Sequence, residues 1–145
     1  MPKWLKYGLI IFSVMILLCG VSSVLTAWSW YGANKDKLKG VSERAKKEGA
    51  AFAFNHDDEA CLDEALRRLS ARSGIIDQAE HKLFLKACLE KAARSPGFCT
   101  SVPPRSEIMA FAQWAVERCA AKGKTGDQDC SRLMQSVQEA CQSGS

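Results

Sequence analysis

The sequence predicts an all-α protein, with a single N-terminal transmembrane helix followed by a small disulfide-stapled domain of two helical hairpins. One reason is that residues Tyr7–Trp28 form a run of 22 residues without a charged side chain. Six of the seven cysteines follow that run, and apolar residues there recur at helical spacing with no useful strand pattern. The expected parts are a membrane anchor at 1–32, a juxtamembrane stalk at 33–54 and a cysteine-rich helical domain at 55–145.

The uncharged run is long enough to cross a bilayer as one helix. At ~1.5 Å per residue it spans the ~30 Å hydrocarbon core. Aromatic rings favour the two membrane–water interfaces. Such rings lie near both ends of the run, at Trp4, Tyr7, Trp28, Trp30 and Tyr31. These features together predict a retained membrane anchor.

Two other interpretations of the N-terminal segment are open. A cleaved secretory signal could end at Val21-Ser22-Ser23, but the apolar core of such a signal is usually only ~7–15 residues long. A lipoprotein acylated at Cys19 would need a small residue before the cysteine, and the bulky Leu18 precedes it. The anchor is therefore favoured over both.

Two features of the sequence disagree about orientation. Lysine and arginine are more numerous after the apolar run than before it, which favours a cytoplasmic domain. The even number of cysteines beyond the run, without metal-type clustering, favours an oxidising compartment. We give the cysteines more weight. The expected location is the bacterial inner membrane, single-pass, with the C-terminal domain in the periplasm.

One side of the anchor carries small residues. Cys19, Ser23 and Ala27 recur every four residues and share one helix face. Small residues at this spacing let a second helix approach closely, so these three form a candidate helix-docking face. The alternative is that small residues are simply common in membrane helices.

The chain after the anchor predicts a series of helices. Residues 35–54 are expected to form a partly helical stalk that Gly40 and Gly49 interrupt, with packing starting near Phe52 and Phe54. The domain helices are expected from the polar step at 55–58 to about Arg72, from Asp77 as N-cap to before Ser95, from about Arg105 to Lys122, and from a cap at Thr125 or Asp127 to about Cys141. The third of these has a wide apolar stripe, expected to face the core, made of Ile108, Phe111, Ala112, Ala115, Val116 and Cys119.

The six cysteines of the domain allow fifteen pairings. In an antiparallel hairpin, residues equidistant from the turn lie side by side. Cys61 and Cys88 are equidistant from the first expected turn, and Cys119 and Cys130 from the last. The final helix then returns Cys141 towards Cys99. The pairs Cys61–Cys88, Cys119–Cys130 and Cys99–Cys141 therefore rank first.

Two nested disulfides on one helical hairpin would resemble the twin-cysteine helical hairpins of the mitochondrial intermembrane space. The spacings depart from that pattern. Ten residues separate Cys130 from Cys141, and nineteen separate Cys99 from Cys119. The resemblance therefore concerns the physical arrangement and implies no family membership.

The residue patterns give no support for catalysis or a bound cofactor. Zinc prefers closely paired ligands, whereas these cysteines are separated by at least ten residues and the only histidines are His56 and His81. Motifs for haem attachment, thiol redox chemistry, a nucleophile elbow and a phosphate loop are absent, and no basic stripe suggests nucleic acid. A small helical core leaves little room for a pocket of ~300 Å³. We expect no enzyme activity, metal, cofactor, nucleic-acid partner or small-molecule substrate.

Three polar or aromatic features have two interpretations each. His56-Asp57-Asp58-Glu59 could be an acid–base or metal site, but a helix N-terminus explains it better. His81 lies on the expected solvated side of its helix. In the proline-containing loop 94–105, Phe98 is either a presented anchor for a protein partner or a core residue beside a disulfide, and the second is favoured.

These observations predict a non-catalytic accessory or assembly subunit, anchored in the membrane and docked outside the cytoplasm onto a larger envelope complex. One alternative is a secreted disulfide-rich binder or inhibitor that is released by signal cleavage. A second alternative is an envelope enzyme or thiol carrier. Expected partners are the membrane and a protein.

Overall fold

The computed structural model describes residues 3–71 and 74–143, without the side chains of residues 3–11, 14 and 75. The described chain contains no strand, and its helices are α1 (Lys3–Ala53), α2 (Asp58–Ala71), α3 (Ile75–Lys91), α4 (Ile108–Ala121) and α5 (Gln128–Ser143). The predicted all-α class is confirmed. The side chains of Trp4 and Tyr7, and the expected helix end at Arg72, lie outside the described residues.

The chain divides into two compact units, Met1–Lys39 and Gly40–Ser145. In the first unit, the described apolar side chains of α1 from Phe12 to Tyr31 are all exposed, including those of Leu25 and Trp28. By length and composition, α1 is the one helix among the described residues that could cross a membrane. Its apolar stretch buries nothing within its own chain.

Helix α1 continues through Gly40 and Gly49, so the expected interruptions of the stalk are wrong. A glycine inside a helix costs only ~1 kcal/mol relative to alanine, which packing can offset. At Gly49 the missing side chain has a structural purpose, because a β-carbon there would overlap Phe84 O and lie 3.1 Å from Ala87 Cβ. Residues from Gly40 onward belong to the second unit, with Ala45 and Ala53 buried in its core.

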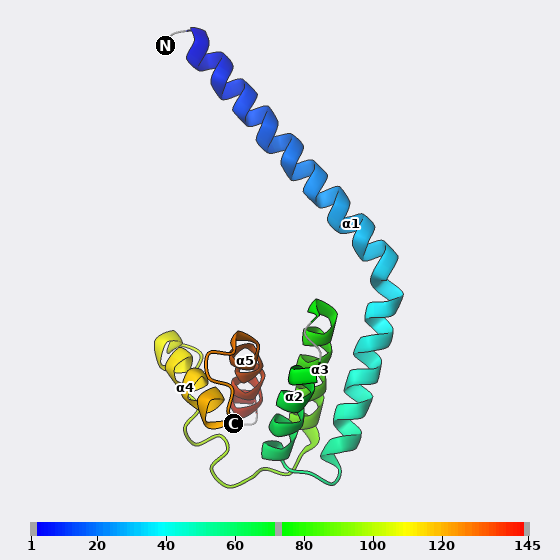
Figure 1. Cartoon of the computed structure of the whole chain (residues 1–145), viewed down its shortest axis with the longest axis vertical. Coiled ribbons are helices and arrows are strands. Elements are labelled where there is room, and N and C mark those ends of the chain that lie inside the picture. Colours follow the sequence, from blue (N-terminus) through cyan, green and yellow to red (C-terminus); the bar gives the residue numbers. More distant parts are fainter. Residues whose placement is uncertain (1–2, 72–73, 144–145) are drawn as a thin grey trace. The chain divides into compact units, whose positions relative to one another are not determined.

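The second unit contains two helical hairpins, α2–α3 and α4–α5. In Figure 1, α5 lies between α4 and the α2–α3 pair, and α5 has contacts with α2, α3 and α4. The core lies where these helices meet, and its largest fully buried side chains are Leu62, Phe84, Leu85, Leu89, Met134 and Val137. This is the disulfide-stapled helical domain that the sequence predicts.

Three disulfides tie the hairpins together. Cys61–Cys88 joins α2 to α3, and Cys119–Cys130 joins α4 to α5. Cys99–Cys141 joins the loop before α4 to the end of α5. The Cα–Cα distances are 5.8 Å for Cys61–Cys88, 6.1 Å for Cys119–Cys130 and 5.4 Å for Cys99–Cys141, within the usual range for disulfides. These are the three pairs that turn symmetry ranks first.

Aspartate side chains cap the N-termini of α5 and α3, and the cap of α3 differs from the expected one. Asp127 Oδ1 accepts hydrogen bonds from Asp129 N and Cys130 N at 2.9 and 3.1 Å and caps α5. The expectation that Asp77 is the N-cap of α3 is wrong, since Gly74 takes that position and its N–H donates to Asp77 Oδ2 at 3.1 Å. The acidic side chain therefore caps from the third helical position, reaching back as in a capping box.

Several side chains differ in burial from what the helical periodicity predicts. His81 is buried instead of solvated, and Phe54 is exposed instead of packed. In α4, only Ala115 and Cys119 of the expected core stripe are buried, whereas Ile108, Ala112 and Val116 are exposed. The stripe is wider than the surface that α5 covers, because α4 lies at the edge of the bundle.

Candidate docking surfaces

The small-residue stripe of α1 is fully accessible. Cys19, Ser23 and Ala27 are all exposed, and Cys19 is a free cysteine. Ser23 Oγ donates to Cys19 O at 2.7 Å, so its hydroxyl is already hydrogen-bonded inside the helix. Such a serine can face lipid or another helix without an unsatisfied donor. The structure thus leaves this face open to a second helix and assigns no occupant to it.

Helix α4 is held in one rotational setting from its inner side. Cys119 is bonded to Cys130 on α5, and Ala115 is buried next to that junction. Towards α2, Arg118 Nη2 lies 2.5 Å from Glu59 Oε2. Lys122 Nζ, at the C-cap of α4, lies 2.5 Å from both Glu59 Oε1 and Asp63 Oδ1. A covalent bond and three ion pairs therefore determine which side of α4 faces outward.

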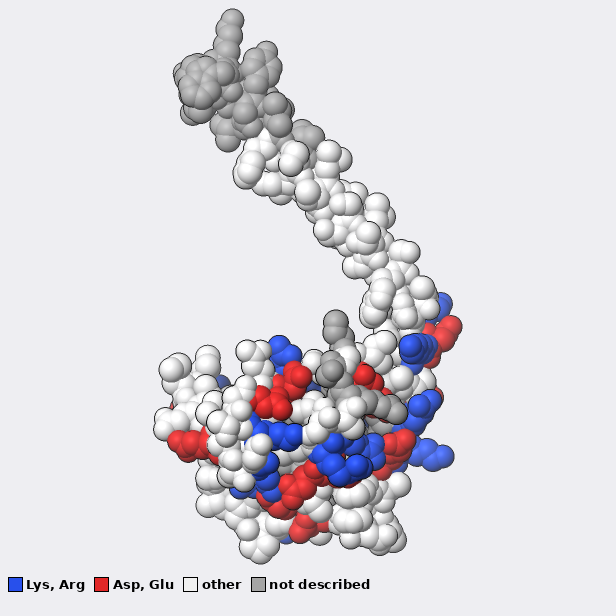
Figure 2. Space-filling view, in the orientation of Figure 1, with Lys and Arg blue, Asp and Glu red and all other residues white. Residues whose placement is uncertain are grey.

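The outward side of α4 is apolar. The exposed fractions of Ile108, Met109 and Val116 are 74%, 82% and 54%. Met109, Ala112, Val116 and Ala120 follow one another at spacings of three or four residues, which places them along a single line of the helix. We call these four residues the α4 row. Figure 2 shows mostly uncharged surface over α4, while charged side chains gather over the middle of the domain.

Few charges border the α4 row. Arg118 is the only basic residue within α4, and it is engaged with Glu59. On the flank, Gln113 Nε2 donates to Glu117 Oε1 at 3.0 Å. Anionic lipid headgroups attract unpaired lysine and arginine side chains. Because the α4 row is neutral and Arg118 is already paired, the row is better suited to contact an apolar protein surface than such headgroups.

The loop before α4 is tied down and keeps Phe98 inside. Pro103 O accepts hydrogen bonds from Gln138 Nε2 and Gln142 Nε2 on α5, at 2.9 and 3.0 Å. Phe98 is only 6% exposed, and the Arg118 guanidinium lies 5.9 Å from its ring centre. The interpretation of Phe98 as a presented anchor is therefore wrong, and the favoured core position beside Cys99 is the observed one.

Each of the four consecutive ionisable residues at 56–59 contacts a different partner. His56 Nδ1 lies 2.8 Å from Phe52 O at the end of α1, and Asp57 Oδ1 accepts from Ala60 N at 2.9 Å, which lowers the pKa of Asp57. Asp58 is fully buried and accepts from Ser95 N at 3.0 Å. Glu59 pairs with α4. Among the described residues, no group of three potential metal ligands converges.

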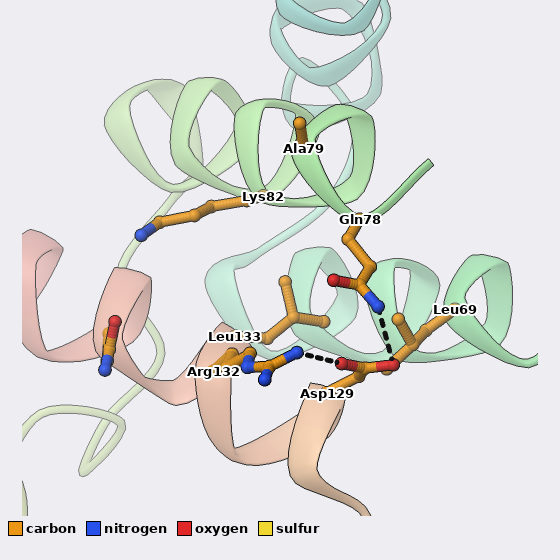
Figure 3. A pocket seen from close by; sticks show the side chains of 8 residues that line it. Leu69, Gln78, Ala79, Lys82, Asp129, Arg132 and Leu133 are labelled. Carbon is orange, nitrogen blue, oxygen red and sulfur yellow. Dashed lines mark hydrogen bonds and ion pairs between the residues drawn. The ribbon is translucent and has the colours of Figure 1, made fainter. Parts of the chain in front are cut away.

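The domain has open hollows of ligand size, contrary to the expectation of little room. The hollow in Figure 3 has a volume of about 370 Å³ and lies between α2, α3 and α5. In it, Asp129 accepts from Gln78 Nε2 at 3.0 Å and pairs with Arg132 at 2.8 Å. Leu69 of α2 and Leu133 of α5 also line the hollow, together with Lys82 of α3, which extends away from Leu69. The hollows lie between helices at the surface, which a volume estimate for the core does not anticipate.

One ion network joins three helices of the second unit. Arg68 donates to Glu64 Oε1 at 2.8 Å within α2 and to Glu48 Oε2 at 2.7 Å on α1. Its guanidinium also lies 3.9 Å from the ring centre of Phe84 on α3. The hydrogen bond from Arg67, followed by that from Arg68, lowers the pKa of Glu64 from 4.5 to about 2.

This lowered pKa predicts a loss of stability in acid. Because the pKa of Glu64 is lower in the folded state, its contribution is complete above its ordinary pKa of 4.5 and disappears as the pH falls towards 2. Arg67 is well exposed, so solvent screening reduces the contribution to ~1–2 kcal/mol. Urea unfolding of Glu64→Gln should depend less on pH over this interval than unfolding of the natural chain. The exposed Glu90→Gln control should keep the natural dependence, and equal pH profiles for all three would contradict the assignment.

The geometry defines a class of protein: a helical, disulfide-bonded domain that follows a helix able to span a membrane and that exposes an apolar helix face. Comparison of the chain with protein-family models, curated proteins and solved structures finds no match. Residue spacing predicts the α1 stripe. It does not predict the α4 row, although the excess width of the apolar stripe on that helix is a signal for an exposed face.

Proposed function

We propose that this chain is a non-catalytic accessory or assembly subunit that docks a protein partner through the α4 row. The observation that carries this proposal is that α4 exposes Met109 and Val116 while a disulfide and three ion pairs keep them outward. Exposed apolar residues in one contiguous row mark interaction surfaces. Docking would remove them from water, with a gain of roughly 25 cal/mol per Å² of apolar area.

The proposed setting is the bacterial inner membrane, with the domain in the periplasm. The supporting findings are that α1 could span a membrane and that three disulfides fit an extracytoplasmic domain. An anchor suits a docking subunit because confinement to the same membrane as its partner raises the effective concentration of both.

The α4 row gives a direct test of the proposal. Val116→Asp should reduce recovery of co-purifying partner from mild detergent by at least about tenfold, because docking would bury an unpaired carboxylate. The side chain of Val116 is exposed, so the domain should keep its three disulfides and its helical circular dichroism. Thr100→Asp, which adds the same charge to an exposed loop position, is the matched control. Equal recovery with both variants would refute docking at α4.

The small-residue face of α1 is a second proposed contact, with a partner helix inside the membrane. Ser23→Leu and Ala27→Leu should each weaken partner recovery several-fold, because the larger side chains prevent close helix approach. Both changes keep the segment apolar, so membrane insertion should persist. Val21→Leu adds bulk on another face of the same helix and should have little effect. If all three variants recover partner equally at matched membrane abundance, the membrane helix has no part in docking.

A further inference from the structure

We infer that the occupant of the α4 row is the α4 row of a second copy of this chain, packed antiparallel across a two-fold axis. This inference rests on the proposed docking role of α4 and names its partner. The row alternates large and small side chains, in the order Met109, Ala112, Val116 and Ala120. Large residues of one row face small residues of the other row only when the two helices run antiparallel.

Antiparallel pairing brings each large residue against a small one. In a two-fold helix pair, facing residues have position numbers with a constant sum. Ala112 and Val116 sum to 228, and Met109 and Ala120 sum to 229, so one axis near residue 114 serves both pairs. The difference of one position is only ~1.5 Å along the helix. A parallel arrangement would instead set methionine against methionine and alanine against alanine, leaving a bulge and a gap.

The chemistry of the row also favours a second copy over a lipid surface. The row itself is uncharged, and Arg118 and Lys122 are already paired with carboxylates of α2. Two such rows can therefore meet without placing a charge inside the row, while the flanking Glu117 keeps its hydrogen bond from Gln113 Nε2. Two-fold contacts of this self-complementary type are the commonest in soluble oligomers.

The α4–α4 contact is small, so its formation should depend on the membrane anchor. Helix α4 has 14 residues and is ~21 Å long, so a pair of them buries less than a typical stable interface of ~1,200–2,000 Å². The contact should be weak between freely diffusing domains and populated between copies confined to one membrane. Dimerisation should therefore be measured with the full chain in membranes.

Site-specific photo-crosslinking tests the occupant and its direction together. A benzophenone amino acid at Met109 of the full chain in its native membrane should give a covalent dimer, attached at residues 117–124 of the second copy. Mixing isotopically light and heavy chains identifies attachments between copies. The same group at Phe54, which is 87% exposed but lies outside α4, should not produce that attachment.

Each alternative product overturns the inference. Attachment at residues 107–111 of a second copy would show parallel packing. Attachment to a different protein would exclude the second copy as occupant and still support the proposed docking role. Attachment to lipid alone, or no product, would exclude protein docking at this face.

A size exchange across the axis provides an independent check. Ala112→Leu should lower the yield of covalent dimer about fivefold, because leucine would face Val116 of the second copy. Adding Val116→Ala should restore the yield, because the facing residue becomes small again. Both residues are exposed, so neither change disturbs the core. Failure of the second change to restore the dimer would contradict this pairing.

Discussion

Replacing both Cys61 and Cys88 with alanine is expected to lower the free energy of unfolding of the cysteine-rich domain by about 3–4 kcal/mol. The bond closes a sequence separation of 27 residues, so its loss releases a large loop in the unfolded state. Both cysteines are fully buried among the core residues of α2 and α3, so their loss also removes packing. Urea unfolding of the full chain in nanodiscs, followed by circular dichroism, measures the change.

Cys19→Ala is the control for this double substitution. Cys19 is exposed on α1 and forms no disulfide. Its replacement should leave the unfolding midpoint of the domain unchanged. If the double substitution shifted the midpoint no more than Cys19→Ala does, the bond would not be a principal support of the domain.

Gly49→Ala is expected to destabilise the second unit by about 2–3 kcal/mol, although alanine is the better helix former. The added β-carbon would overlap Phe84 O and lie 3.1 Å from Cys88 N, and backbone atoms cannot move aside as a flexible side chain can. The residues of α1 from Gly40 onward would therefore have to separate from α3. Thermal unfolding of the full chain should show the loss as a lower midpoint.

The matched control for Gly49 is Gly40→Ala in the same helix. A β-carbon at Gly40 meets nothing within 4 Å. Alanine there should stabilise the helix by ~0.5–1 kcal/mol through its higher helix propensity. The two substitutions should thus shift the unfolding midpoint in opposite directions, and a shift of the same sign would contradict the close approach at Gly49.

The sequence predicts those features of the fold that depend on local spacing. The hairpin geometry ranks the disulfide pairs Cys61–Cys88 and Cys119–Cys130 because residues equidistant from a turn must lie side by side. It does not predict the role of Gly49, because helix propensity treats glycine as a breaker and cannot indicate that the backbone of α3 will pack directly against it.

Of the two candidate docking surfaces, the sequence likewise predicts only the one that depends on local spacing. The α1 stripe of Cys19, Ser23 and Ala27 follows from a four-residue spacing. The α4 row does not, because periodicity shows that a helix face is apolar and not whether the bundle covers it. Val116 and Ala115 are neighbours in one apolar stripe. Val116 is exposed and Ala115 is buried because α4 lies at the edge of the bundle. His81 fails for the opposite reason, since a polar residue type suggests exposure where packing buries it.

The most direct measurement of the proposed function is native mass spectrometry of the protein released from its own membrane into lipid nanodiscs. The account predicts an assembly at least twice the mass of a single chain, in which each copy retains Trp4 and carries three disulfides. Val116→Asp should reduce that assembly to single chains. A natural protein that is released as a single chain, or one whose mature N-terminus lies near Val24, would contradict the anchored docking subunit.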